Sequence, residues 1–197
     1  MNSYFSLHPY YSKGALKLSV DYSFDDVPDP HIMKKPVRTP GAFVKSFRFA
    51  ESGHIKEDML ANGVGWDILS ERICNILKTS CSKTEIELIP LSDNPNASDR
   101  LKGYHILGVT KRIQCVDYDH SDILWSNLNP DSKYILSFRK CVIRDDAVPQ
   151  DINCFLIAEY PSYPVMTSAL VRKIELLHPS GLVFKPIEIV RTNSSGS

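Results

Sequence analysis

The fold is decided by residues 66–91, which read WDILSERICNILKTSCSKTEIELIPL. Residues 66–69 predict a short extended lead, and Ser70 is of a type that favours the N-cap of a helix. The apolar residues that follow fall on one helical stripe, namely Ile73, Ile76 and Leu77. After a polar break, residues 86–91 predict a strand. The stretch therefore predicts a strand–helix–strand unit.

The same pattern recurs about 97 residues later, which indicates an internal repeat. Residues 164–187 read PVMTSALVRKIELLHPSGLVFKPI, with Thr167 as N-cap and a stripe of Leu170, Val171 and Ile174. Each copy has a proline in its second strand, Pro90 and Pro186. Because proline cannot donate to a strand ladder, we expect both strands at a sheet edge, at a bulge or at a strand end. The chain thus holds two approximate strand–helix–strand units.

The remaining segments mostly predict strands. Period-two patterns and β-branched or aromatic residues mark residues 15–20, 42–49, 104–109, 111–116, 133–143 and 153–160. A further short helix is expected over 54–61, with Asn62 and Gly63 as stop signals. Many strands and few helices predict an α+β domain, with short helices on one face of a mostly antiparallel sheet. A doubly wound fold is excluded because regular alternation of strand and helix is absent.

Composition divides the chain into three parts. Residues 1–50 are expected to hold N-terminal strands and a proline-rich loop or arm, residues 21–40, whose four prolines disfavour regular structure. Residues 51–191 are expected to form the α+β core, and the small polar residues 192–197 a frayed tail. Since 197 residues is close to the usual domain size, we expect one compact domain.

Bulk composition excludes several classes of partner and location. The 23 Lys and Arg balance 23 Asp and Glu, so the chain lacks the basic excess that is typical of nucleic-acid binders. No apolar run approaches the roughly 20 residues of a membrane helix, and residues 1–10 lack the features of a secretion signal. The five cysteines include no C-x-x-C pair and predict reduced, mostly buried thiols. We therefore expect a cytoplasmic protein that binds neither nucleic acid nor membrane.

The densest group of chemistry-bearing side chains is Asp117-Tyr118-Asp119-His120-Ser121-Asp122. Its carboxylates and imidazole are of types that bind metal ions. It does not match a calcium loop, because Asp122 stands where glycine is needed and Leu128 where glutamate is needed. The common phosphate, dinucleotide and hydrolase motifs are absent as well. We therefore assign no catalytic residue, no metal ligand and no cofactor, and three interpretations stay open: a solvated turn, an acidic loop that faces a partner, and a metal-dependent active site.

Several fragments, in order, resemble a family of bacterial immunity proteins from polymorphic toxin systems. They are Ile68-Leu69-Ser70-Glu71-Arg72-Ile73, Glu87-Leu88-Ile89-Pro90-Leu91, Tyr104-His105-Ile106-Leu107, Val116-Asp117, Ser121 and Gly181-Leu182-Val183-Phe184-Lys185-Pro186-Ile187. The resemblance spans residues 64–190 and departs from the family pattern in the long segment before the helix, so residues 21–40 are expected to be specific to this chain. It implies a small cytoplasmic protein that binds and blocks a toxin domain made beside it, and it supplies no catalytic residues.

We hypothesise that acidic and aromatic loops carry such an interface. Residues 113–132 contain four aspartates and no Lys or Arg, which produces a local negative field despite the zero total charge. The candidate interface residues are Asp117, Tyr118, Asp119, Asp122, Trp125, Tyr160 and Tyr163. One alternative is that Trp125, Tyr160 and Tyr163 are core or strand-end packing. Another is that Asp117 to Asp122 serve a metal-dependent hydrolase or an immunity enzyme that reverses a toxin's modification. The identity of the toxin and the oligomeric state stay open.

Overall fold

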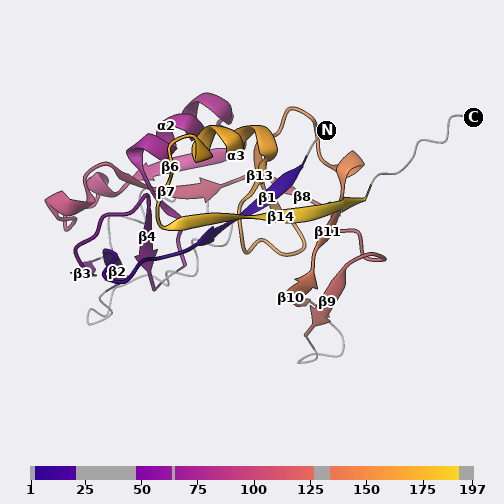
Figure 1. Ribbon diagram of the computed structural model, residues 1–197, viewed down its shortest axis with the longest axis horizontal. Helices are drawn as coiled ribbons and strands as arrows, with labels where there is room; N and C mark the ends of the chain where they lie inside the picture. The colour runs from indigo at the N-terminus through magenta and orange to yellow at the C-terminus, as the bar shows by residue number, and fades with distance from the viewer. Residues whose placement is uncertain (1–2, 21–47, 64, 127–133, 191–197) are drawn as a thin grey trace, which may run out of the picture.

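The computed structural model describes residues 3–20, 48–63, 65–126 and 134–190 (Figure 1). In chain order the elements are β1 (Tyr4–Pro9), β2 (Lys17–Val20), β3 (Phe49–Ser52), β4 (Met59–Asn62), β5 (Ile68–Ser70), α2 (Glu71–Ser80), β6 (Ile86–Pro90), β7 (Tyr104–Val109), β8 (Arg112–Ile113), β9 (Asp122–Trp125), β10 (Ile135–Lys140), β11 (Val142–Arg144), β12 (Cys154–Ile157), β13 (Val165–Thr167), α3 (Ser168–Glu175) and β14 (Leu182–Val190). This is an α+β fold that is mostly sheet, as the sequence predicts.

The described strands form two six-stranded sheets and one separate pair. The order is β3-β2-β4-β5-β7-β6 in the first sheet, β11-β14-β1-β13-β12-β8 in the second, and β10-β9 in the pair. Neighbours are antiparallel except for β2 with β4, β8 with β12 and β11 with β14. The expected mostly antiparallel pairing is confirmed, but it is divided between two large sheets.

The two large sheets repeat one arrangement. Strands β2-β4-β5-β7-β6 have the same order and the same relative directions as β8-β12-β13-β1-β14. Helix α2 follows β5 as α3 follows β13, and Tyr104 lies opposite Ser70 as Tyr4 lies opposite Thr167. The two predicted units are confirmed, and the repeat extends to five strands of each sheet.

In each strand–helix–strand unit, the strand that lies between the two strands of the unit comes from the other repeat. β7 leads into β8 of the second sheet and yet lies between β5 and β6 in the first. β1 leads into β2 of the first sheet and yet lies between β13 and β14 in the second. Each repeat therefore gives its first strand to the sheet of the other, so the two halves are interlocked. Below, the first half means the sheet that holds β7, and the second half the sheet that holds β1.

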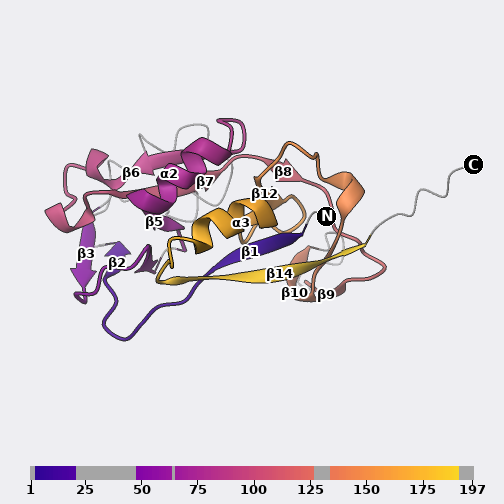
Figure 2. The ribbon, with the colours of Figure 1, turned by 45° about the horizontal axis from the view of Figure 1, so that its top comes forward.

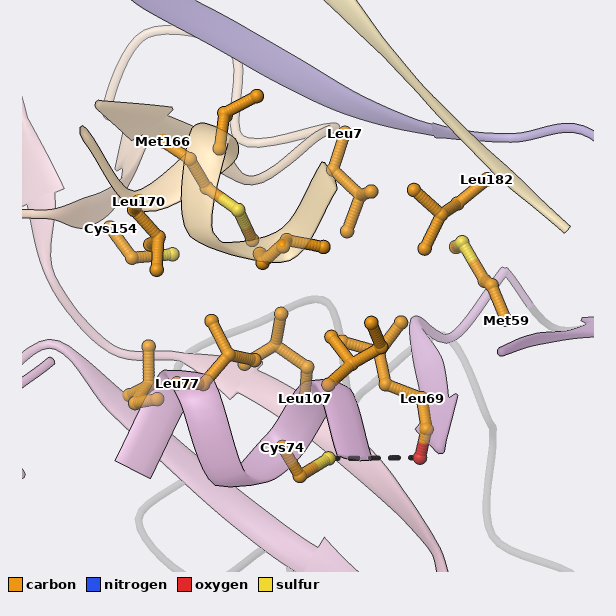
Figure 3. Close-up of a cluster of buried hydrophobic side chains, with 14 residues drawn as sticks. Leu7, Met59, Leu69, Cys74, Leu77, Leu107, Cys154, Met166, Leu170 and Leu182 are labelled. Atoms are coloured by element: carbon orange, nitrogen blue, oxygen red, sulfur yellow. Dashed lines mark hydrogen bonds between the residues drawn. The ribbon is translucent and has the colours of Figure 1, made fainter. Parts of the chain in front are cut away.

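A shared hydrophobic cluster lies between the two halves. Helices α2 and α3 contact each other (Figure 2), and Figure 3 shows side chains from both halves meeting between them. Equivalent positions fill this cluster, such as Leu7 with Leu107 and Leu77 with Ile174. Each sheet also carries a cluster on its opposite face, because successive strand residues point to alternate faces.

Hydrogen bonds at the helix starts are duplicated too. Asp58 precedes β4 and Asn153 precedes β12, at equivalent places. The Ser70 hydroxyl donates to Asp58 Oδ1 at 2.7 Å, and the Thr167 hydroxyl lies 3.0 Å from Asn153 Oδ1. Thr167 Oγ accepts from the Leu170 N–H in addition, whereas Ser70 makes no such cap bond. The predicted N-cap positions are confirmed, although the Ser70 hydroxyl is used differently.

The same two residues tie each half to a turn of the other. Asp58 Oδ2 accepts from the Ser180 N–H at 2.9 Å, just before β14, and it pairs with the Arg72 guanidinium. The Asn153 N–H donates to Glu85 Oε2 at 2.6 Å, just before β6. Because the carboxylates of Asp58 and Glu85 are buried, their hydrogen bonds hold the interlocked halves in one register.

The expected helix over 54–61 is wrong. This segment ends in strand β4, which pairs with β2 on one side and β5 on the other. Met59 faces the shared cluster and Leu60 the outer cluster of the first half. Two buried faces require the alternation of a strand, so tertiary packing overrides the local helix signal.

The expectation for the two prolines holds for one strand and fails for the other. β6 is an edge strand, and Pro90 is its last residue. β14 lies inside its sheet, between β11 and β1. β11 pairs only with Glu188 to Val190 of β14, so Pro186 precedes that ladder and no donor is lost to it. The strand expected over 42–49 lies outside the described residues up to position 47, and β3 begins at Phe49. The proline-rich segment 21–40 and the tail 192–197 also lie outside them.

Candidate functional site

The acidic stretch forms a turn that β11 holds in place. The Asp117 N–H donates to the Val142 carbonyl at 2.9 Å, and the Val142 N–H donates to Ser121 Oγ at 3.0 Å. Asp117 Oδ1 accepts from the His120 N–H at 3.0 Å and lies 2.9 Å from His120 Nδ1. The hydrogen bond from the His120 side chain lowers the pKa of Asp117, so this carboxylate is charged at neutral pH. The hydrogen bonds of Asp117 and Ser121 thus fix the shape of the turn, and residues 118–120 lie between these two fixed points.

Two of the predicted aromatic residues meet on the surface. The rings of Tyr118, in the turn, and Trp125, in β9, are stacked with centroids 6.2 Å apart and planes 11° apart. Their exposed fractions are 52% and 38%. Trp125 is the last residue of β9, so it packs at an exposed strand end and not in the buried core. Asp122 begins β9 beside them, 4.0 Å from Arg139 of β10.

The other two predicted aromatic residues lie apart from each other. Tyr160 packs edge-on against Phe138 of β10, with ring centroids 5.4 Å apart, at the base of the hairpin. The ring of Tyr163 packs against the ring of His8 in β1, with ring centroids 4.1 Å apart. The structure therefore joins Tyr160 to the hairpin and Tyr163 to the second sheet.

A hollow of about 550 Å³ opens beside the turn. It is lined by Gln114, Val116, Asp117, Tyr118, Asp119, Arg144 and Glu159. Glu159 Oε1 accepts from the Val116 N–H at 3.3 Å, and its Oε2 is buried without a hydrogen-bond partner among the described residues. Arg144 and Glu159 were not expected here, because no local pattern links them to the turn.

The hairpin itself adds exposed apolar residues that the sequence analysis did not single out. Leu124, Tyr134 and Leu136 are 45%, 49% and 44% exposed. A signal was present, because Ile123-Leu124-Trp125 places apolar side chains on both faces of one strand. Ile123 uses one face to pack against the outer cluster of the second half, so Leu124 is left on the other.

The chemistry available for metal binding or nucleophilic attack is limited. Within the part of the chain that the structure describes, no three or more His, Cys, Asp or Glu side chains form a group that could hold a metal ion. All five cysteines are free. Burial raises the pKa of Cys74, Cys81 and Cys115 to about 12, so these thiols are protonated at neutral pH. None of the helices that the structure describes is long and apolar enough to cross a membrane.

These features define a class of protein: a duplicated α+β scaffold whose acidic turn and aromatic hairpin form an exposed face. The model of the Imm11 immunity protein family matches residues 25–188, so the chain belongs to this family. A search of curated proteins gives no match. The family match begins well before residue 64, so the expectation that the proline-rich segment is specific to this chain is wrong from residue 25 onward.

Proposed function

We propose that the chain binds one toxin domain of a polymorphic toxin system in the bacterial cytoplasm and blocks its active site by occlusion, without catalysis. The observation that carries this proposal is membership of an immunity protein family over residues 25–188. Occlusion needs a complementary surface of about 1,600 Å² in total and a few buried anchors, and it needs no reacting groups.

The acidic turn and the hairpin are the face that we propose for this contact. Tyr118 and Trp125 supply aromatic anchors that are already stacked and exposed, so little side-chain freedom is lost on binding. Asp119 and Asp122 supply negative charge that speeds the encounter with a basic active-site cleft. Asp117 fixes the turn through His120.

The two remaining aromatic candidates have different places in the proposal. Tyr160 supports the face from below through Phe138. Tyr163 contacts β1 and is kept as a separate interface candidate.

The decisive experiment uses the toxin domain encoded in the neighbouring reading frame, titrated with the purified chain. Occlusion predicts complete inhibition at equimolar ratio, and full recovery of toxin activity after the two proteins are separated. Inhibition at a small fraction of the toxin concentration would instead favour an immunity enzyme that uses Asp117 to Asp122. Absence of binding would refute the proposal.

A charge series tests the proposed face. The double substitution Asp119→Asn and Asp122→Asn should slow association about tenfold at low salt and reduce its dependence on salt. Asp93→Asn, an exposed aspartate of the first half, is the matched control. Unchanged association and salt dependence in the double variant would remove the turn from the interface.

A further inference from the structure

We propose that the exposed apolar side of the β9–β10 hairpin is the principal anchor for the toxin, and that it docks an apolar patch bordered by basic side chains. This inference rests on the proposed function and adds the surface and the chemistry of the partner. We call this surface the hairpin patch; it comprises Leu124, Tyr134 and Leu136.

The two faces of the hairpin have different tasks. Ile123 and Phe138, which lie opposite each other, pack against the outer cluster of the second half. The hairpin patch faces away from that cluster, and its three members are 44–49% exposed. Trp125 lies two residues after Ile123, so the Tyr118–Trp125 pair is on the other face of the hairpin. Three large exposed hydrophobic side chains thus gather on one face of a small element, whereas a soluble monomer usually scatters them singly.

The hairpin stands outside both large sheets. β9 and β10 pair with each other and join neither large sheet in the described part of the chain, and they project from the body in Figure 1. In the first half, the corresponding connection between β2 and β4 supplies β3, which joins the sheet itself. In the part of the chain that the structure describes, the two halves therefore differ at the place where apolar side chains are exposed, which favours a binding role for the hairpin.

The charges beside the patch specify the partner. Arg139 and Lys140 of β10 each lie near a carboxylate, of Asp122 at 4.0 Å and of Glu188 at 2.8 Å. On the other border, residues 113–126 contain no Lys or Arg, and Asp119 makes no ion pair with a residue that the structure describes. Asp117, Asp119 and Glu159 line the hollow at this border together with a single basic side chain, Arg144, so the formal charge of its lining is negative. A partner that covers the patch is therefore expected to place basic side chains opposite Asp119.

The test measures the affinity of full-length chains for the toxin domain from the neighbouring reading frame, inactivated by substitution. Leu124→Ser combined with Leu136→Ser should weaken binding by at least about tenfold, because anchor residues dominate interface energy. Leu176→Ser is the matched control, since this leucine is 79% exposed on the other side of the fold, after α3; it should change affinity less than about twofold. A second pair of variants consists of Tyr134→Ser and its control, Tyr10→Ser. Tyr10 is 73% exposed and lies outside the hairpin patch.

The possible outcomes separate the two proposals. Wild-type binding with an unaffected double variant would overturn the hairpin patch and leave the proposed function standing. No binding by the wild type would overturn both. Analytical ultracentrifugation tests whether a second copy of this chain occupies the patch instead. If the wild type is a dimer and the double variant is a monomer with unchanged toxin affinity, the patch is a dimer interface and the proposal is overturned.

Discussion

Tyr4 and Tyr104 occupy equivalent positions in the two halves of the molecule, although Tyr4 begins β1 and Tyr104 begins β7, a hundred residues later. Each lies opposite the N-cap residue of a helix, and each ring is buried, with 1% and 6% exposed. Their hydroxyl groups have unrelated partners: Tyr4 donates to Asp145 Oδ1 at 3.1 Å, and Tyr104 to the Glu57 carbonyl at 2.9 Å. The duplicated core is thus retained while the polar surroundings have diverged.

The equivalence predicts similar costs for truncation at paired core positions. Leu7→Ala and Leu107→Ala should each reduce the free energy of unfolding by about 2–5 kcal/mol, because both remove a buried side chain from the shared cluster. Urea denaturation of the two variants measures this. Leu176→Ala, at an exposed leucine, should cost less than about 0.5 kcal/mol. A loss below 1 kcal/mol at either core position would contradict the shared cluster.

Gly181 is predicted to tolerate no side chain. It has a φ of +78°, and a Cβ there would lie 2.5 Å from the Met59 carbonyl oxygen. Gly181→Ala should therefore lower the free energy of unfolding by about 3 kcal/mol or prevent folding. Gly63→Ala is the control, because nothing lies within 4 Å of a Cβ at that position. Equal thermal midpoints for the two variants would show that β4 and the turn before β14 do not approach as described.

Asp58 predicts a specific loss of stability in acid. Burial alone would raise the pKa of Asp58, but hydrogen bonds from Arg72, Ser70 and Ser180 outweigh it and hold the pKa below its ordinary 3.8. A carboxyl whose pKa is lower in the folded state stabilises the fold above the unfolded value, and this stabilisation is lost as the pH falls through the folded value.

The measurement is the free energy of unfolding from pH 7 down to pH 3. The wild type should lose stability below about pH 4, and Asp58→Asn should be less stable at pH 7 and show a flatter decline. Asp93→Asn should keep the wild-type slope. A wild-type slope in Asp58→Asn would show that this carboxyl does not carry the acid sensitivity.

The five thiols should be slow to react in the folded protein. Burial raises the pKa of Cys141 to about 11 and those of Cys74, Cys81 and Cys115 to about 12, so little thiolate is present at pH 8. A disulfide reagent such as DTNB should react slowly with the folded protein, as measured by the release of thionitrobenzoate. After unfolding in guanidinium, it should react with all five thiols within seconds. A rapid phase in the native protein would identify an open thiol and contradict this burial.

The units that could be predicted from the sequence are those set by neighbouring residues. Ser70 and Thr167 mark both helix starts, and the stripes after them mark the buried faces, so the repeat and the α+β class follow from local pattern. The exchange of β1 and β7 could not be predicted, because the pairing of Tyr4 with Ile187 joins opposite ends of the chain and no short-range signal encodes it.

The candidate site was predictable in part for the same reason. The acidic turn, Tyr118 and Trp125 lie within one short stretch, so the sequence marks them as candidates, although it does not indicate that the two rings stack. Glu159 reaches the turn only through the fold. Leu124 and Leu136 have the sequence pattern of ordinary strand residues. Only the structure shows that no other described element packs on their face of the hairpin.

The exchanged first strands also fix the order in which this protein can be completed during synthesis. β1 leaves the ribosome long before its two neighbours in the sheet, β13 and β14. Until the final residues of β14 emerge, the second sheet has no finished partner for Tyr4 and Leu7. Closure of the shared core therefore waits for the release of β14, and such distant pairing makes folding slow.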